Sequence, residues 1–233
     1  MYKISIIIPC FNEYKTILKI IEKIKNFPKY HKEIIIVDDC SSDGTTNLIN
    51  NLVDHNIKVA FHKKNYGKGR AIKTGLEFVT GDYIIIQDAD LEYDPSNYSN
   101  LMKPFEETDA EVVYGSRFLG GGSYVRIHFF WHYLANKILT FFCNLITNLN
   151  MTDMETGHKV FKSNVLKSIT IEENSFGIEP EITIKLAKNK FKFFEVPISY
   201  NGRSYEEGKK IRLVDAFVAI YCLIKYGIFY RKV

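Results

Sequence analysis

The chain has 233 residues, 46% of them hydrophobic and 25% charged, which is the composition of an ordinary globular protein and excludes a disordered or fibrous chain. Its 31 lysine and arginine residues exceed its 27 acidic residues, but the net charge of +4 is too small to indicate a nucleic-acid-binding protein. Residues 185–233 hold eleven of the basic residues against four acidic ones, so we expect the C-terminal end to meet something anionic.

Apolar runs in the first half of the chain predict buried strands. These runs are Ile4–Pro9, Glu33–Val37, Ile57–Phe61, Tyr83–Ile86 and Glu111–Tyr114. Apolar residues at helical spacing predict helices between the strands. The helices are one capped by Asn12 with Ile17, Leu18, Ile21 and Ile24 on one face, one capped by Asp43 with Leu48, Ile49, Leu52 and Val53, one over Gly69–Val79, and one opened by Pro95. This alternation predicts an α/β fold with a mainly parallel sheet covered on both faces.

The alternation of strands and helices changes after residue 117, where a run of three glycines predicts a flexible joint. The elements expected beyond it are an aromatic stretch over Ile127–Ile146, helices over Ser163–Ile169, Glu179–Lys188 and Leu213–Tyr230, a strand over Lys192–Tyr200, and a basic loop over Asn201–Lys210. Pro197 favours an edge position for its strand, because proline has no N–H for a neighbour. We expect one domain over residues 1–233 rather than two independent units.

Neither of the two most apolar stretches is long enough to cross a membrane. A transmembrane helix needs about 20 mostly apolar residues, whereas residues 127–146 are interrupted by polar side chains and residues 216–224 stop at Lys225. Both stretches could lie on a membrane surface. The N-terminal apolar run is too short for a signal peptide, and scattered cysteines without a Cys-x-x-Cys pair indicate a reducing compartment. We therefore expect a cytoplasmic protein.

Acidic residues gather where two predicted strands end. Asp38 and Asp39 follow the second strand, and Asp88 and Asp90 follow the fourth. Ligands of open parallel sheets bind beyond the carboxyl ends of the strands, so four carboxylates there favour a binding site over ordinary helix capping. With Glu92 two residues beyond it, the Asp-Ala-Asp triplet has the hard oxygen ligands that hold Mg²⁺ or Mn²⁺ and leave positions open for phosphate oxygens.

Several motifs, in this order, resemble those of family-two glycosyltransferases with the GT-A fold. They are Pro9-Cys-Phe-Asn-Glu13, Val37-Asp-Asp-Cys-Ser-Ser-Asp43, Asn65-Tyr-Gly-Lys-Gly69, Asp88-Ala-Asp90 and Gly115-Ser-Arg117. Later motifs are similar to those of the dolichyl-phosphate mannosyltransferase-like branch, whose acceptors are polyprenyl phosphates. These are Asp153-Met-Glu-Thr-Gly157, Phe176-Gly-Ile-Glu-Pro-Glu181 and Glu195-Val-Pro-Ile-Ser-Tyr200.

The resemblance implies a Rossmann-like GT-A domain whose residues 1–117 bind a nucleotide sugar and whose residues 118–233 form an acceptor-binding elaboration with amphipathic helices. The implied donor-binding residues are Pro9, Asn12, Glu13, Asp38, Asp39, Lys68, Asp88, Arg203 and Lys209. Glu13 could equally serve as a partner of the helix dipole. The implied metal ligands are Asp88, Asp90 and Glu92, although many relatives have Gln at the last position. Arg117 and Arg203 are preferred to Arg126 and Lys209 as phosphate ligands.

The acceptor decides the mechanism that the resemblance implies. A polyprenyl phosphate is already anionic and needs no strong base, so positioning and metal electrostatics suffice. A sugar or lipid hydroxyl needs a carboxylate to remove its proton, and Asp153 and Glu155 are the candidates. Together with Asp90 and Arg117 these are the expected catalytic residues. Either reaction would invert the anomeric centre.

The favoured hypothesis is a metal-dependent transfer of a hexose from GDP-mannose or UDP-glucose to a polyprenyl phosphate at the cytoplasmic face of a membrane. It includes peripheral membrane contact, excludes nucleic acid, and leaves room for a separate membrane partner protein. The alternatives are a hydroxyl acceptor and a non-catalytic nucleotide-sugar-binding scaffold, which would usually have lost the metal carboxylates. A nucleotidyltransferase is disfavoured, because Phe11-Asn12-Glu13 stands where such enzymes carry a Gly-rich loop with Arg.

Overall fold

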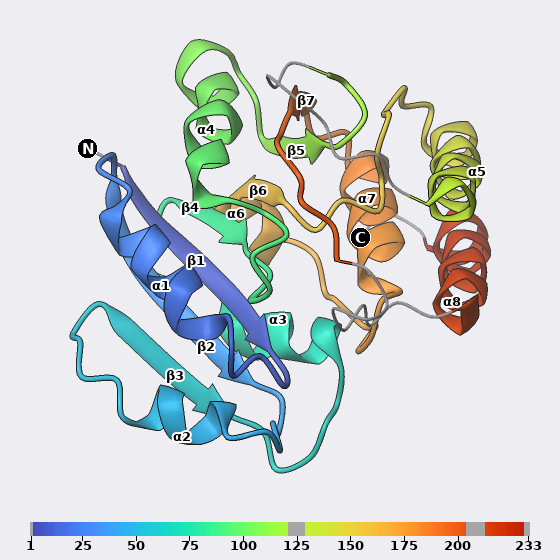
Figure 1. Ribbon diagram of the computed structural model, residues 1–233. Coiled ribbons are helices and arrows are strands. Elements are labelled where there is room, and N and C mark those ends of the chain that lie inside the picture. Colours follow the sequence, from blue (N-terminus) through green and yellow to red (C-terminus); the bar gives the residue numbers. More distant parts are fainter. Residues whose placement is uncertain (1, 121–128, 204–212, 231–233) are drawn as a thin grey trace.

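A computed structural model of the chain describes residues 2–120, 129–203 and 213–230. Within these ranges, seven strands form one sheet in the order β3-β2-β1-β4-β6-β5-β7 (Figure 1). The strands are β1 (Lys3–Cys10), β2 (His31–Asp38), β3 (Ile57–Phe61), β4 (Tyr83–Ile86), β5 (Val112–Ser116), β6 (Lys159–Lys162) and β7 (Phe193–Pro197). Only β6 runs antiparallel to its neighbours, which are β4 and β5. The prediction of a mainly parallel sheet is confirmed.

The sequence does not predict β6. Its four residues, Lys-Val-Phe-Lys, are too few to establish a strand-like alternation. The sheet decides its conformation, because β6 fits between two buried strands and places Phe161 opposite both Ile84 and Val112. The edge position that Pro197 predicts is confirmed, since β7 is the last strand of the sheet.

Helices cover both faces of the sheet. They are α1 (Ile17–Asn26), α2 (Thr45–Asn50), α3 (Lys68–Leu76), α4 (Tyr98–Glu107) after the 3₁₀ turn η1 (Pro95–Asn97), α5 (Phe130–Thr147), α6 (Ser163–Lys167), α7 (Ile178–Lys188), and α8 (Leu213–Ile224) with its π-helical end η2 (Lys225–Phe229). Along β1, Ile6 and Ile8 pack in one apolar cluster with α1 and α4, whereas Ile7 packs in another with α3, α6 and α7. This alternation is what a strand buried on both faces requires.

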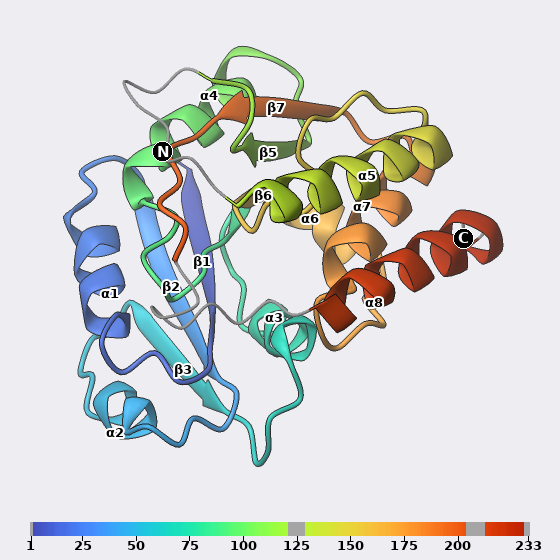
Figure 2. The same ribbon diagram turned by 45° about the vertical axis from the view of Figure 1, so that its right-hand side comes forward.

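Helices α5 and α8 form an outer layer beyond α7. Both pack against α7 and against each other, and the two ribbon views agree that they lie at one end of the molecule, away from α1 and α2 (Figures 1 and 2). Leu139 and Cys143 of α5 and Cys222 and Leu223 of α8 join the apolar cluster that contains α7. The inner sides of α5 and α8 are therefore buried against α7.

Some details of the predicted helices are wrong. Helix α1 begins later than predicted, because Asn12 has a φ of 52° and its side-chain oxygen accepts the N–H of Ser42 at 2.8 Å. Leu18 is 43% exposed, and Ile20 takes its place in the apolar core. Helix α2 ends before Val53, which is 99% exposed. In both helices the spacing of apolar residues predicts the helix correctly, but the adjoining loops determine where the helix begins or ends and which residues face the sheet.

Candidate active site

Acidic side chains gather at the carboxyl ends of three neighbouring strands. Asp38 ends β2, Asp88 and Asp90 follow β4, and Glu13 follows β1, which lies between them in the sheet. Because these strands run parallel, their carboxyl ends meet at one edge of the sheet. The structure thus brings together residues that are far apart in the sequence.

Asp38 and Asp39 are buried and bind loops of the chain itself. Asp38 accepts hydrogen bonds from the hydroxyls of Ser41 and Thr46 at 2.5 and 2.6 Å. Asp39 accepts the backbone N–H of Gly67 at 2.6 Å. The two carboxylates therefore shape the loops around the strand ends, and a contact of either one with a base or ribose stays a prediction.

Lys68 lies between Asp88 and a second carboxylate, Glu179 of α7. Its Nζ is 2.9 Å from Oδ1 of Asp88 and 3.1 Å from Oε1 of Glu179. Burial disfavours the ammonium charge, but the two carboxylates outweigh burial and raise the pKa of Lys68 above its ordinary value. Gly157 is so close to Asp88 that a Cβ at this position would lie 2.4 Å from Oδ2. Asp88 is thus paired with Lys68 through one oxygen, and the absence of a side chain at Gly157 leaves the space that its other oxygen occupies.

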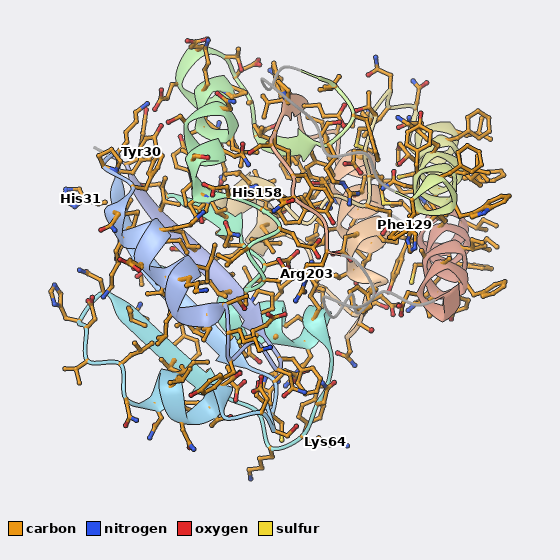
Figure 3. All side chains as sticks on the ribbon, in the orientation of Figure 1. Tyr30, His31, Lys64, Phe129, His158 and Arg203 are labelled. Atoms are coloured by element: carbon orange, nitrogen blue, oxygen red, sulfur yellow. The ribbon has the colours of Figure 1, made fainter. Side chains whose placement is uncertain are left out.

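Arg203 binds three carboxylates at once. Its Nη2 lies 2.9 Å from Oδ2 of Asp90 and 3.2 Å from Oε1 of Glu13, and its Nε donates to Oε1 of Glu92 at 3.0 Å. Figure 3 shows Arg203 near the middle of the molecule. Burial and the carboxylates of Asp88 and Glu92 raise the pKa of Asp90 to about 7, and Arg203 offsets only part of that effect.

The carboxylates fit a divalent cation by donor type and by charge. Among the described residues, no three His, Cys, Asp or Glu side chains form a ready metal site, because Asp88 is turned toward Lys68, and Asp90 and Glu92 toward Arg203. The acidic side chains nevertheless outnumber these two cations, and burial together with the charges of Asp88 and Glu92 raises the pKa of Asp90. Hard oxygen donors with excess negative charge suit Mg²⁺ or Mn²⁺.

Asp153 is bound by Arg117 and by α5. The Nε and Nη2 of Arg117 donate to its two carboxylate oxygens, each at 2.7 Å, and Asn136 of α5 donates to Oδ1 at 2.9 Å. Although Asp153 is fully buried, Arg117 holds the pKa of its carboxyl below the usual range. A carboxylate that is paired in this way is a weak proton acceptor, so the geometry favours a positioning role for Asp153.

Glu155 belongs to a second group of buried titratable side chains. Its Oε1 and the Oε2 of Glu179 have no hydrogen-bond partner among the described residues. Burial and the charge of Glu179 raise the pKa of Glu155 to about 8, while burial lowers the pKa of Lys159 to about 8. Burial thus favours the protonated form of Glu155, and its use as a base stays a prediction.

His158 lies in the interior of the protein (Figure 3) and makes the stability depend on pH. It is fully buried, neither ring nitrogen has a hydrogen-bond partner among the described residues, and burial lowers its pKa from 6.5 to about 4. Between those values the unfolded chain binds a proton that the folded chain does not. The contribution of neutral His158 to the free energy of unfolding is therefore fully present above pH 6.5. It falls by about 3 kcal/mol as the pH drops to 4.

Urea denaturation between pH 7 and pH 4 measures this loss. The His158→Phe variant keeps the contacts with the rings of Tyr93 and Tyr98 and cannot titrate, so it serves as the control. Its free energy of unfolding should fall less than that of the wild type by about 3 kcal/mol. Equal losses in the two proteins would contradict the assignment.

Sequence reasoning missed several residues that the structure places at the site. Glu179 and Tyr200, which donates a hydrogen bond to Glu92, belong to motifs on which the resemblance rests, so the motifs themselves pointed to these segments. Asn136 had only a weak signal, which is a polar residue within an aromatic stretch. Of the other candidates, Pro9 lies in β1 opposite Val37. Arg126 and Lys209 lie outside the described residues.

The family model described as Glycosyl transferase family 2 matches residues 5–170, a range that contains the acidic site and Asp153. This chain belongs to glycosyl transferase family 2. The match covers more than half of the chain, so the glycosyltransferase assignment from the motifs is confirmed at the level of the family.

Relatives of this family 2 glycosyltransferase extend along most of its length. The uncharacterized protein MJ0544 of Methanocaldococcus jannaschii is 30% identical over 226 residues, which cover 88% of this chain and 93% of that protein. Glycosyltransferase AglJ of Haloferax volcanii is 25% identical over 203 residues, which cover 86% of this chain and 63% of AglJ.

Solved structures confirm the GT-A fold. Glucosyl-3-phosphoglycerate synthase from Mycobacterium tuberculosis, in complex with Mn²⁺, uridine diphosphate and phosphoglyceric acid, has a TM-score of 0.74 at 18% identity. The similarity covers 99% of this chain and 80% of that enzyme. At this level of identity the likeness shows the shared fold and leaves donor and acceptor to the chemistry of the site.

Proposed function

We propose that this family 2 glycosyltransferase moves a hexose from a nucleotide sugar, of the GDP-mannose or UDP-glucose type, to a polyprenyl phosphate. The supporting observation is that α5 faces the site on one side and is exposed and aromatic on the other. Asn136 binds Asp153 at 2.9 Å, whereas Trp131, Phe141 and Leu145 are 74%, 62% and 71% exposed. An acceptor with an anionic head and a hydrocarbon tail matches a phosphate-binding site beside an apolar surface.

Two arginines would handle the phosphate groups. Arg117 lies with its guanidinium 5.1 Å from the centre of the Tyr200 ring, so it is close to the segment that carries Arg203. Asp153 orients Arg117 through a two-point ion pair, the arrangement that fixes a guanidinium plane. Since a phosphate acceptor is already anionic, the protein needs to align its oxygen with the anomeric carbon and needs no base. In-line attack by that oxygen inverts the anomeric centre.

Asp88, Asp90 and Glu92 would hold Mg²⁺ or Mn²⁺, which when bound stabilises the charge that develops on the leaving diphosphate. Lys68 keeps the Asp88 carboxylate in place through its 2.9 Å contact. The structure of glucosyl-3-phosphoglycerate synthase, which shares this fold, was solved with Mn²⁺ and uridine diphosphate. This supports a divalent cation in the proposed reaction.

A hydroxyl acceptor is the second candidate. The same structural relative holds phosphoglyceric acid, and an acceptor that reacts through a hydroxyl needs a base, for which Asp153 and Glu155 are the candidates. The low pKa of Asp153 weighs against that residue as the base. Loss of the chemical step in Asp153→Asn or Glu155→Gln, with donor binding intact, would favour the hydroxyl acceptor.

The direct test is incubation of the chain with polyprenyl phosphate, Mg²⁺ or Mn²⁺ and a panel of labelled nucleotide sugars. We expect a lipid-linked sugar with one donor and none when the metal is chelated. Product formed only on a soluble hydroxyl acceptor would support the second candidate, and no transfer with any donor or acceptor would contradict both.

The proposed lipid acceptor places the outer sides of α5 and α8 against the cytoplasmic face of a membrane, either alone or with a separate membrane protein. Exposed apolar side chains line both helices, among them Phe217, Tyr221 and Ile224 of α8, and Figure 3 shows side chains extending from both helices at that end of the molecule. Helix α5 carries no acidic residue that would repel anionic lipid. None of the described helices is both long and apolar enough to span a membrane.

Trp131 provides a measurement of this contact, because it is the one tryptophan of the sequence and 74% of it is exposed. We expect its fluorescence to shift to the blue on addition of vesicles containing anionic lipid, and Phe141→Ser to weaken vesicle co-sedimentation several-fold. Val53→Ser removes an apolar side chain beyond α2 that is even more exposed, at 99% against 62% for Phe141, and should have no effect. Unchanged emission and sedimentation would contradict membrane contact through α5.

A further inference from the structure

Arg203 lies among three carboxylates of the candidate active site. Its side chain is 18% exposed and lies against Glu13, Asp90 and Glu92, which are 6%, 16% and 11% exposed. Carboxylates buried to this degree need a counter-charge. The guanidinium supplies that charge, and two of the carboxylates that it binds are among the proposed metal ligands.

Both carboxylate oxygens of Glu92 are engaged by the chain itself, which a residue that served only as a metal ligand would not require. Its Oε1 accepts both the Nε and the backbone N–H of Arg203, at 3.0 and 3.1 Å, and its Oε2 accepts the hydroxyl of Tyr200. Among the described residues, every hydrogen bond to the Glu92 side chain comes from Tyr200 or Arg203. Glutamine at this position would keep an oxygen for a metal but would lose the charge that attracts the guanidinium.

We propose that Arg203 is a built-in competitor of the divalent cation. Without nucleotide, its guanidinium holds Glu13, Asp90 and Glu92, and Mg²⁺ or Mn²⁺ binds Asp90 and Glu92 only after Arg203 has left them. The inference rests on the metal role proposed for Asp90 and Glu92.

The competition couples metal binding to the diphosphate of the donor. A guanidinium released from the carboxylates needs another anion, and a diphosphate offers planar pairs of oxygens that match it. Metal and diphosphate therefore each favour the arrangement that the other needs, which is positive coupling between two ligands. The site would bind the cation weakly by itself and strongly together with the donor.

Mn²⁺ binding, followed by the electron paramagnetic resonance signal of the free ion, tests the competition without any transfer reaction. In the absence of nucleotide, Arg203→Gln should bind Mn²⁺ about tenfold more tightly than the wild type, which is a typical size for a coupling of this kind. Lys103→Gln removes the same charge from a side chain of α4 that is 63% exposed, and should leave the affinity close to that of the wild type. With uridine or guanosine diphosphate present, the advantage of Arg203→Gln should shrink.

An unchanged or weaker Mn²⁺ affinity in Arg203→Gln, relative to Lys103→Gln, would overturn the proposal. If the variant fails to fold, hydrogen exchange of the wild type decides the question. The backbone N–H of Arg203 donates to Glu92, so saturating Mn²⁺ without nucleotide should speed its exchange. Exchange that is slowed or unaffected would contradict the competition.

The Mn²⁺-binding experiment and the test of sugar transfer can fail independently of each other. A chain that binds Mn²⁺ competitively with Arg203 but transfers no sugar would retain the competition and lose the function. A chain that transfers sugar to polyprenyl phosphate, with an Mn²⁺ affinity that Arg203→Gln does not raise, would retain the function and lose the competition.

Discussion

Asp90→Asn is expected to lower the rate constant of sugar transfer by about a thousandfold, the loss typical of removing one group that stabilises charge in a transition state. Asp90 is buried beside Asp88 and Glu92, and these surroundings raise its pKa to about 7. Asparagine keeps the shape and one oxygen but removes the charge. Initial rates measured over a titration of Mn²⁺ will separate a loss of metal affinity from a loss of rate at saturation.

Asp94→Asn is the matched control for this substitution. Asp94 lies close to Asp90 in the sequence, but its carboxylate is 37% exposed and pairs with Lys23 on the surface. The same change there should leave the rate within about twofold of the wild type, because exposed ion pairs contribute little. Equal effects of the two substitutions, or an Asp90→Asn enzyme with nearly full activity, would remove Asp90 from the metal site.

Arg117→Met is expected to lower the free energy of unfolding by about 3–5 kcal/mol, because it leaves a buried carboxylate without its partner. Asp153 is fully buried and receives both of its 2.7 Å hydrogen bonds from this guanidinium. Urea denaturation measures the loss. Sugar transfer should disappear as well, since the same guanidinium is proposed to bind phosphate.

The double variant Arg117→Met with Asp153→Asn separates the two effects. Removing both charges leaves no uncompensated ion, so the double variant should recover part of the stability that Arg117→Met loses, while transfer stays absent. A double variant whose loss equals the sum of the two single losses would show that the pair does not interact energetically.

The two arginines of the site differ in how their charges are paired. Arg117 and Asp153 form a closed two-point pair, next to Asn136 of the helix with the exposed aromatic side. The single positive charge of Arg203 is shared among three carboxylates, so it cannot neutralise all three. The first arrangement suits a fixed acceptor-side residue, and the second suits a residue that changes partners.

The sequence by itself determined the first half of the fold and the acidic edge of the sheet. Strands β1 and β2 contain the apolar runs 6–8 and 34–37, and short runs of this kind favour a strand that is buried on both faces. Asp88 and Asp90 follow such a strand directly, so their place at the edge of the sheet follows from local order in the chain.

Only the tertiary structure decided which groups neutralise the carboxylates. Glu13 and Arg203 are 190 residues apart and meet because β1 lies beside β4 in the sheet and the segment after β7 returns over both. The strand β6 and the partners of Asp153 likewise depend on which elements become neighbours. Such contacts leave no periodic pattern in the sequence, since their stability comes from pairing distant charges and strands rather than from the local propensity of either segment.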